Sequence, residues 1–289
     1  MTTTPQPGEL QTWKVVLAYD GTDFRGWQIQ PGQPTIQGEL QAALGRVTGE
    51  APLPQGSGRT DAGVHALAQV ASFALRAPIP PGSFRLALNR TLPPAIRVIE
   101  AKTVPDAFHA RHSTVAKTYE YRVYLERPPQ GPGRIIECPP FLSRYVYSYP
   151  WPLQFAALEA AARQFIGTHD FLSFAATDPD EATRVGKIPP GRESDQDELG
   201  HKGAIRTIFS SCWEQQGVED TVLLIYRVRG SGFLHHMVRN LVGTMLDVGR
   251  GYRRADQIQA MIAARARAAA GPTAPARGLF LHSVEYPES

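Results

Sequence analysis

The first hundred residues alternate strand-like runs with amphipathic helices, and this order limits the possible folds more than any other feature of the chain. The predicted elements are a strand over 13–19, a helix over 35–48, an extended piece near Leu53, a strand over 66–75, a helix over 81–92 and a strand over 96–104. The order βαββαβ predicts an α+β class, a ferredoxin-like sheet with helices on one face.

The second half repeats this order loosely. Its predicted elements are strands over 117–125, 204–214, 221–228 and 278–286 and helices over 152–166, 233–248 and 256–265. We therefore predict a disordered tail over 1–11, an N-terminal α/β domain over 12–112 and a C-terminal α/β domain over 113–289. Residues 178–203 combine charges, Pro and Gly without an apolar period, which predicts a long mobile loop.

Composition excludes several classes of protein. With 42% hydrophobic and 20% charged residues, the 289-residue chain is globular rather than disordered. Its two cysteines, Cys138 and Cys212, form no paired motif, which excludes a disulfide framework and a cysteine-rich zinc site. We expect a cytoplasmic protein, because the sequence shows neither a secretory signal nor an apolar run that could span a membrane.

Basic residues are concentrated locally, because the net charge of the whole chain is only +3. One stretch carries a single acid, Asp247, among six arginines: Arg227, Arg229, Arg239, Arg250, Arg253 and Arg254. Such a patch could neutralise phosphates, or it could be a solvated helix face.

Two pairs of histidines are candidate metal ligands. The pairs His109/His112 and His235/His236 match no known metal-binding helix motif, so we expect structural or solvent-facing histidines and no metal.

The most unusual stretch is 56–65, in which glycines surround Arg59 and Asp61. Glycine allows the backbone to approach a ligand closely. The same residues also suit a tight turn in which the aspartate bonds to its own backbone. Neither spacing typical of the common phosphate-binding loops is present.

Residues 58–65, GRTDAGVH, resemble the catalytic loop of the TruA family of tRNA pseudouridine synthases. Further motifs in the family's order extend the resemblance over nearly the whole chain. They are YDGT (19–22), GWQ (26–28), TIQG (35–38), FHAR (108–111), KTYEY (117–121), HDF (169–171), RTI (206–208), FLHHMVRN (233–240) and GL (278–279). The segment 178–203 is longer than this family leads us to expect.

The resemblance implies the pseudouridine synthase fold, in which antiparallel sheets of two ferredoxin-like halves meet around a central RNA-binding cleft. It implies a cofactor-free conversion of uridine to pseudouridine at positions 38, 39 and 40, in the anticodon stem-loop of tRNA. It also implies a homodimer with a tRNA lying across both subunits. The site residues follow by position: Asp61 is the catalytic aspartate, Arg59 helps to extrude the target nucleotide, Tyr119 stacks on the target base, and Arg239 pairs with the aspartate.

The residue types suit this chemistry. The base must leave C1′, turn over and rejoin through C5, with no change in composition or oxidation state. An aspartate, with a reference pKa of about 3.9, is ionised at neutral pH. It could attack C1′, attack the uracil ring or remove a proton from the sugar.

Two other functions compete with this one. A non-catalytic RNA-binding or RNA-folding protein would need no carboxylate at Asp61, so the combination of Asp61, Arg59 and Tyr119 argues against it. A metal-dependent hydrolase lacks a recognisable ligand set.

Overall fold

The computed structural model describes residues 8–127, 135–176, 203–218 and 221–287. The chain forms two compact units, one made of residues 1–120 together with 276–289 and the other of residues 121–275. The predicted α+β class is confirmed. Most of the predicted tail over 1–11 and nearly all of the predicted loop over 178–203 lie outside the described residues.

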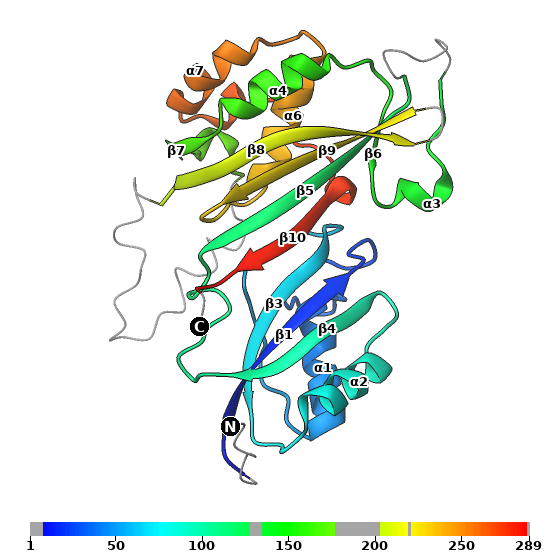
Figure 1. The fold of residues 1–289 in the computed structure, drawn as a ribbon, viewed down its shortest axis with the longest axis vertical. Helices are drawn as coiled ribbons and strands as arrows, with labels where there is room; N and C mark the ends of the chain where they lie inside the picture. Colours follow the sequence, from blue (N-terminus) through cyan, green and yellow to red (C-terminus); the bar gives the residue numbers. More distant parts are fainter. Residues whose placement is uncertain (1–7, 128–134, 177–202, 219–220, 288–289) are drawn as a thin grey trace. The chain divides into compact units, whose positions relative to one another are not determined.

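The first unit is a sheet with two helices on one face (Figure 1). Its strands are β1 (Gln11–Tyr19), β2 (Gln55–Gly56), β3 (His65–Leu75), β4 (Ile96–Val104) and β10 (Leu279–Glu285), and its helices are α1 (Ile36–Thr48) and α2 (Pro81–Thr91). The strand order is β4-β1-β3-β10, and β2 pairs with β3. This sheet contains the βαββαβ elements predicted from the sequence.

Alternating side chains of β1 build the core of this unit. Trp13, Val15 and Leu17 are buried, while the residues between them are partly exposed, which is the period expected of a strand with one face against helices. The Trp13 ring meets the ring of Phe84 on α2 edge-on at 4.6 Å between centroids. Thr35 caps α1, because its side chain accepts a hydrogen bond from the Gly38 N–H group.

The last strand belongs to the first unit, although the sequence pattern placed it at the end of the C-terminal domain. β10 runs parallel to β3, with Phe280 opposite His65 and Leu281 opposite Ala66. This pairing joins segments more than two hundred residues apart in the chain. Hydrophobic periodicity reports which residues face a core but does not identify a distant partner strand.

The second unit is built on a long antiparallel hairpin. Its elements are β5 (Ala116–Leu125), which begins in the first unit, α3 (Pro140–Ser143), β6 (Tyr147–Tyr149), α4 (Phe155–Arg163), β7 (Gly167–Asp170), β8 (Ile205–Val218), β9 (Thr221–Gly230), α6 (Met237–Gly249) and α7 (Ile258–Ala263). The strand order is β5-β9-β8-β7, and α4, α6 and α7 lie on one face of β8 and β9 (Figure 1).

Helix α6 starts four residues later than predicted. His236, immediately before it, adopts φ +58°, in the left-handed region. A residue in this conformation cannot continue an α-helix towards the N-terminus, so the helix begins at Met237. None of the helices in the described ranges is long and apolar enough to cross a membrane.

Candidate active site

The loop between β2 and β3 carries Arg59 and Asp61, and hydrogen bonds from buried side chains hold its first part. The Ser57 N–H group donates to the carbonyl of Val70 at 2.8 Å. The Ser57 hydroxyl donates to Gln69 Oε1 at 2.7 Å, and Gln69 Nε2 donates to the Gly58 carbonyl at 2.9 Å. Gln69 is completely buried, so its carboxamide is a fixed clamp on the two residues that precede Arg59.

Lys117 adds a charged contact to the same part of the loop. Its Nζ donates to the Ser57 carbonyl at 2.5 Å, and a Cβ atom on Gly58 would lie 2.9 Å from that nitrogen. Lys117 lies two residues before Tyr119, so both side chains leave β5 on the same side. No sequence pattern predicts a role for Ser57, Gln69 or Lys117, although Lys117 stands within the KTYEY motif.

Thr60 anchors the loop between the two functional candidates. Its buried hydroxyl lies 2.8 Å from the Tyr19 hydroxyl, and its carbonyl accepts a hydrogen bond from the Trp27 N–H group at 3.0 Å. Arg59 is exposed and Asp61 is half-buried. Because Thr60 is held on both its side chain and its backbone, the backbone of the residues on either side of it has little freedom to move.

Two glycines allow neighbouring segments to approach the loop. Gly21 comes so close to the Val64 carbonyl that a Cβ atom would lie 2.0 Å from its oxygen. Gly26, with φ +89°, would place a Cβ atom 2.5 Å from the Thr60 carbonyl oxygen. Backbone contacts of this kind exclude any side chain, which explains why glycine is required in the YDGT and GWQ motifs.

His65 closes the loop at the start of β3. Its Nδ1 accepts a hydrogen bond from the Gly21 N–H group at 3.1 Å, its Nε2 lies 3.2 Å from the Arg277 carbonyl, and its ring stacks on Phe280 at 4.7 Å. Since Nδ1 accepts, Nε2 must carry the proton that binds the carbonyl. Asp20 Oδ1 lies 3.2 Å from Nδ1 and could replace Gly21 as its partner only if Nδ1 were protonated.

Tyr119 is buried close to Asp61. Burial raises the pKa of the Tyr119 phenol most, and the nearby Tyr19 phenol and the negative charge of Asp61 raise it further. Burial also raises the pKa of Tyr19 to about 12, although its hydrogen bonds with Thr60 and Gln69 oppose the shift. Both phenols are therefore neutral at physiological pH. The structure brings Asp61 and Tyr119 close together within the first unit, and Arg59 lies two residues before Asp61 in the same loop.

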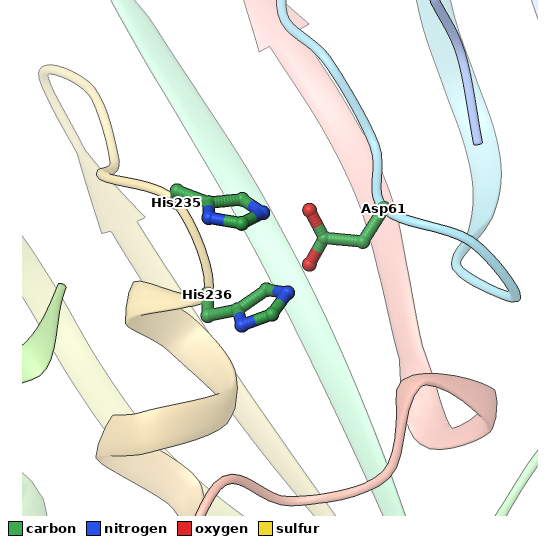
Figure 2. A group of neighbouring side chains, drawn as sticks. All are labelled: Asp61, His235 and His236. Atoms are coloured by element: carbon green, nitrogen blue, oxygen red, sulfur yellow. The ribbon is translucent and has the colours of Figure 1, made fainter. Parts of the chain in front are cut away.

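Arg239 lies in the first turn of α6, in the second unit. Its Nε donates to the Ala274 carbonyl at 2.7 Å, which fixes the plane of the guanidinium group. His235 and His236 precede the helix with ring centroids 3.9 Å apart. Figure 2 shows the two rings on the turn that precedes α6. It also shows the Asp61 side chain on the loop that precedes β3.

The arginine-rich stretch is partly neutralised. Arg227 pairs with Glu214 at 2.6 Å, Arg253 with Asp247 at 3.3 Å, and Arg254 with Asp256. Aromatic rings cover two further members: Arg229 lies over Phe209, and Arg250 lies over Trp151 and Tyr252. Two of the three acids, Glu214 and Asp256, lie outside the stretch, so its local composition overstates its free positive charge.

The first histidine pair stabilises a turn. His109 Nδ1 lies 3.1 Å from the Arg111 N–H group and 3.3 Å from that of His112, and both groups donate to it. Burial and the neighbouring positive groups lower the pKa of His109, which keeps Nδ1 available as an acceptor.

Comparison with known proteins identifies the family. The sequence profile of a family described as tRNA pseudouridine synthase matches residues 15–113 and 191–287. The chain is 46% identical over 273 residues to tRNA pseudouridine synthase A of Solibacter usitatus, covering 94% of this chain and 98% of the relative. The proteins of the same name from Moorella thermoacetica and Anoxybacillus flavithermus are 42% and 41% identical, again over 94% of this chain and 98% of each relative. The chain therefore belongs to the TruA family of tRNA pseudouridine synthases, which are isomerases.

Proposed function

We propose that this enzyme converts uridine to pseudouridine at positions 38, 39 and 40 in the anticodon stem-loop of tRNA, with Asp61 as the catalytic carboxylate. The observation that carries the proposal is the tethered loop: Ser57, Gly58 and Thr60 are fixed by buried partners, while Asp61 is left half-buried. A catalytic group that is held in one place before the substrate binds loses little conformational entropy during the reaction, which lowers the activation free energy.

Asp61 acts at the sugar or the base. The C1′–N1 bond breaks, the base turns, and a C1′–C5 bond forms while the proton of C5 is lost and N1 gains one. Attack on C1′, attack on uracil and removal of a sugar proton all need one carboxylate beside the extruded nucleotide. Since atoms and electrons balance within the substrate, the proposal includes no cofactor.

Arg59 and Tyr119 would handle the extruded nucleotide. Arg59 is exposed next to the anchored Thr60, where a guanidinium group can contact a phosphate as the base leaves the stack. Extrusion costs a few kcal/mol, and stacking on an aromatic ring returns about 1–3 kcal/mol. Only 8% of Tyr119 is exposed, so contact with the base would use a small part of the ring. The neutral phenol of Tyr119 can also donate a hydrogen bond to the extruded nucleotide.

We infer a cytoplasmic homodimer with a tRNA lying across both subunits, and Arg239 acts in it as a cationic partner of the aspartate and the substrate. Light scattering of the purified protein tests the dimer, because a monomer has half the mass.

The experiment that tests the function is mapping of pseudouridine at nucleotide resolution on an unmodified tRNA transcript. Wild type, Asp61→Asn and Asp106→Asn are compared without added metal or nucleotide. Asp106 is an aspartate of the same unit that accepts a hydrogen bond from Thr12, so its variant controls for the loss of a carboxylate. We expect modification at positions 38–40 by wild type and by Asp106→Asn only. Modification by Asp61→Asn, or at other positions only, would contradict the proposal.

A further inference from the structure

Residues 271–275 pack directly on helix α6. A Cβ atom on Gly243, within the helix, would lie 1.7 Å from the Pro272 carbonyl oxygen. A Cβ atom on Gly271 would lie 2.7 Å from the Cα atom of Thr244. Glycine on both sides therefore permits backbone-to-backbone contact, and residues 271–275 are called the clamp segment below.

Hydrogen bonds join the clamp segment to α6 at both of its ends. At one end the Gly271 N–H group donates to Thr244 Oγ1 at 2.8 Å. At the other end the Ala274 N–H group donates to the Arg239 carbonyl at 3.1 Å, and Arg239 Nε donates back to the Ala274 carbonyl at 2.7 Å. The side chain of Arg239 is thus oriented by a carbonyl that its own backbone helps to hold.

A polar cluster of three side chains fixes the middle of the clamp segment. Arg267 donates to the Gly271 carbonyl through Nη1 at 2.9 Å, and to Asn240 Oδ1 and Thr273 Oγ1 through Nη2 at 3.1 and 3.0 Å. The Thr273 hydroxyl donates to Asn240 Oδ1 at 2.6 Å, and Asn240 Nδ2 donates to the Phe174 carbonyl at 2.7 Å. Asn240 is completely buried and follows Arg239 directly in α6.

We infer that Arg267 is a positioning residue for Arg239. Its forked guanidinium bridges the clamp segment and Asn240, which sets the place of the Ala274 carbonyl and hence the direction of the Arg239 side chain. The inference rests on the proposed function, in which Arg239 contacts the aspartate and the substrate. The buried apolar side chains of α6 also anchor the helix, so we expect it to form without the contacts of Arg267 and Thr273.

Arg267→Lys tests the bridge with little change in charge or volume. A lysine has one nitrogen and cannot bind the Gly271 carbonyl and the Asn240–Thr273 pair in the geometry of the fork. We expect the single-turnover rate of pseudouridine formation to fall about tenfold, because small displacements of a positioned group cost one to two orders of magnitude. Arg265→Lys is the matched control, since Arg265 lies two residues earlier and pairs with Asp170 at 3.0 Å instead.

The Thr273 variants separate positioning from loss of structure. Thr273 is exposed, so Thr273→Val should keep the melting temperature of the wild type. It removes the hydroxyl that bonds to both Arg267 and Asn240, and we expect the rate to fall as it does in Arg267→Lys. Thr273→Ser retains the hydroxyl and should restore the rate. Equal rates for the valine and serine variants would overturn the inference.

A double-mutant cycle with Arg239→Lys completes the test. If Arg267 acts through Arg239, the tenfold effect of Arg267→Lys should largely disappear in the Arg239→Lys background. The inference is overturned if Arg267→Lys slows both backgrounds by the same factor, or slows neither, while Arg239→Lys alone is slow. If Arg239→Lys alone keeps the wild-type rate, the proposed role of Arg239 fails instead, and the positioning inference fails with it.

Discussion

The hydroxyl groups of Tyr19 and Thr60 lie 2.8 Å apart in the interior of the first unit. This contact joins the end of β1 to the residue between Arg59 and Asp61. Gln69 Nε2 approaches the same Tyr19 oxygen at 3.5 Å, so the two anchors of the loop meet at one phenol. The fold of the unit and the order of the loop therefore depend on the same buried polar groups.

Tyr19→Phe should slow the reaction, whereas a similarly destabilising substitution in the second unit should not. Removing the hydroxyl leaves the Thr60 hydroxyl without this partner and should cost about 1–2 kcal/mol of unfolding free energy. Tyr226→Phe is the matched control, because its buried hydroxyl lies 2.8 Å from Ser211 Oγ in the second unit. Urea unfolding should give similar losses for the two variants, while single-turnover assays should show a slower reaction for Tyr19→Phe only. Equal rates would argue that the Thr60 anchor has no catalytic consequence.

Gly26→Ala should lower the thermal stability of the protein far more than Gly32→Ala. Both glycines have positive φ, +89° and +69°, so backbone strain in each alanine variant should lower the unfolding free energy by about 1–2 kcal/mol. Only at Gly26 would the new Cβ meet the Thr60 carbonyl oxygen, at 2.5 Å, whereas no described atom lies within 4 Å of a Cβ on Gly32. Thermal melts of the two variants give the difference. A smaller loss of stability at position 26 would show that the loop can move away at little cost.

The strands and helices of the first unit could be predicted from the sequence because they follow regular periods. The strand over 13–19 and the helix over 35–48 correspond to β1 and α1, with small differences at their ends. The pairing of β10 with β3 could not be predicted, since no local pattern specifies a partner strand. The start of α6 was missed because the left-handed conformation of His236 has no signal of its own in an apolar helical pattern.

The residues of the candidate site could also be predicted only in part. Arg59, Asp61, Tyr119 and Arg239 were named from motifs, and their roles stay predictions. The groups that hold them were missed: Gln69 is a polar residue in an apolar strand, and Arg267 lies in an alanine-rich segment without a regular period. Such residues act through contacts between distant segments, so their function is visible only when the partners are known.

Gln69→Leu should disorder the start of the loop. Leucine fills a similar volume but leaves the Gly58 carbonyl and the Ser57 hydroxyl without their Gln69 partner, at a cost of about 1–3 kcal/mol for each buried group. Hydrogen exchange should become faster at the amides of residues 57–61 and stay unchanged in α6. Exchange that is unchanged at residues 57–61 would show that Lys117 and the Ser57–Val70 backbone bond hold the loop without the carboxamide.

Stability should fall steeply above pH 10 because buried tyrosines resist ionisation in the folded protein. Burial raises the pKa of Tyr19 to about 12, and it also raises the pKa of Tyr119 and Tyr226. An unfolded tyrosine ionises near pH 10, so between pH 10 and 12 the unfolded state binds fewer protons than the folded state. Each of these tyrosines then contributes a loss of about 1.4 kcal/mol of unfolding free energy per pH unit, whereas below pH 10 its contribution is constant.

Urea unfolding between pH 8 and 11 measures this slope directly, and tyrosinate absorbance of the folded protein shows whether the phenols stay neutral. Tyr19→Phe should remove one tyrosine's share of the slope, about 1.4 kcal/mol per pH unit. A wild-type curve that stays flat to pH 11 would mean that the phenols of Tyr19 and Tyr119 ionise as readily in the folded enzyme as in the unfolded chain, and the neutral phenol beside Asp61 would have to be abandoned.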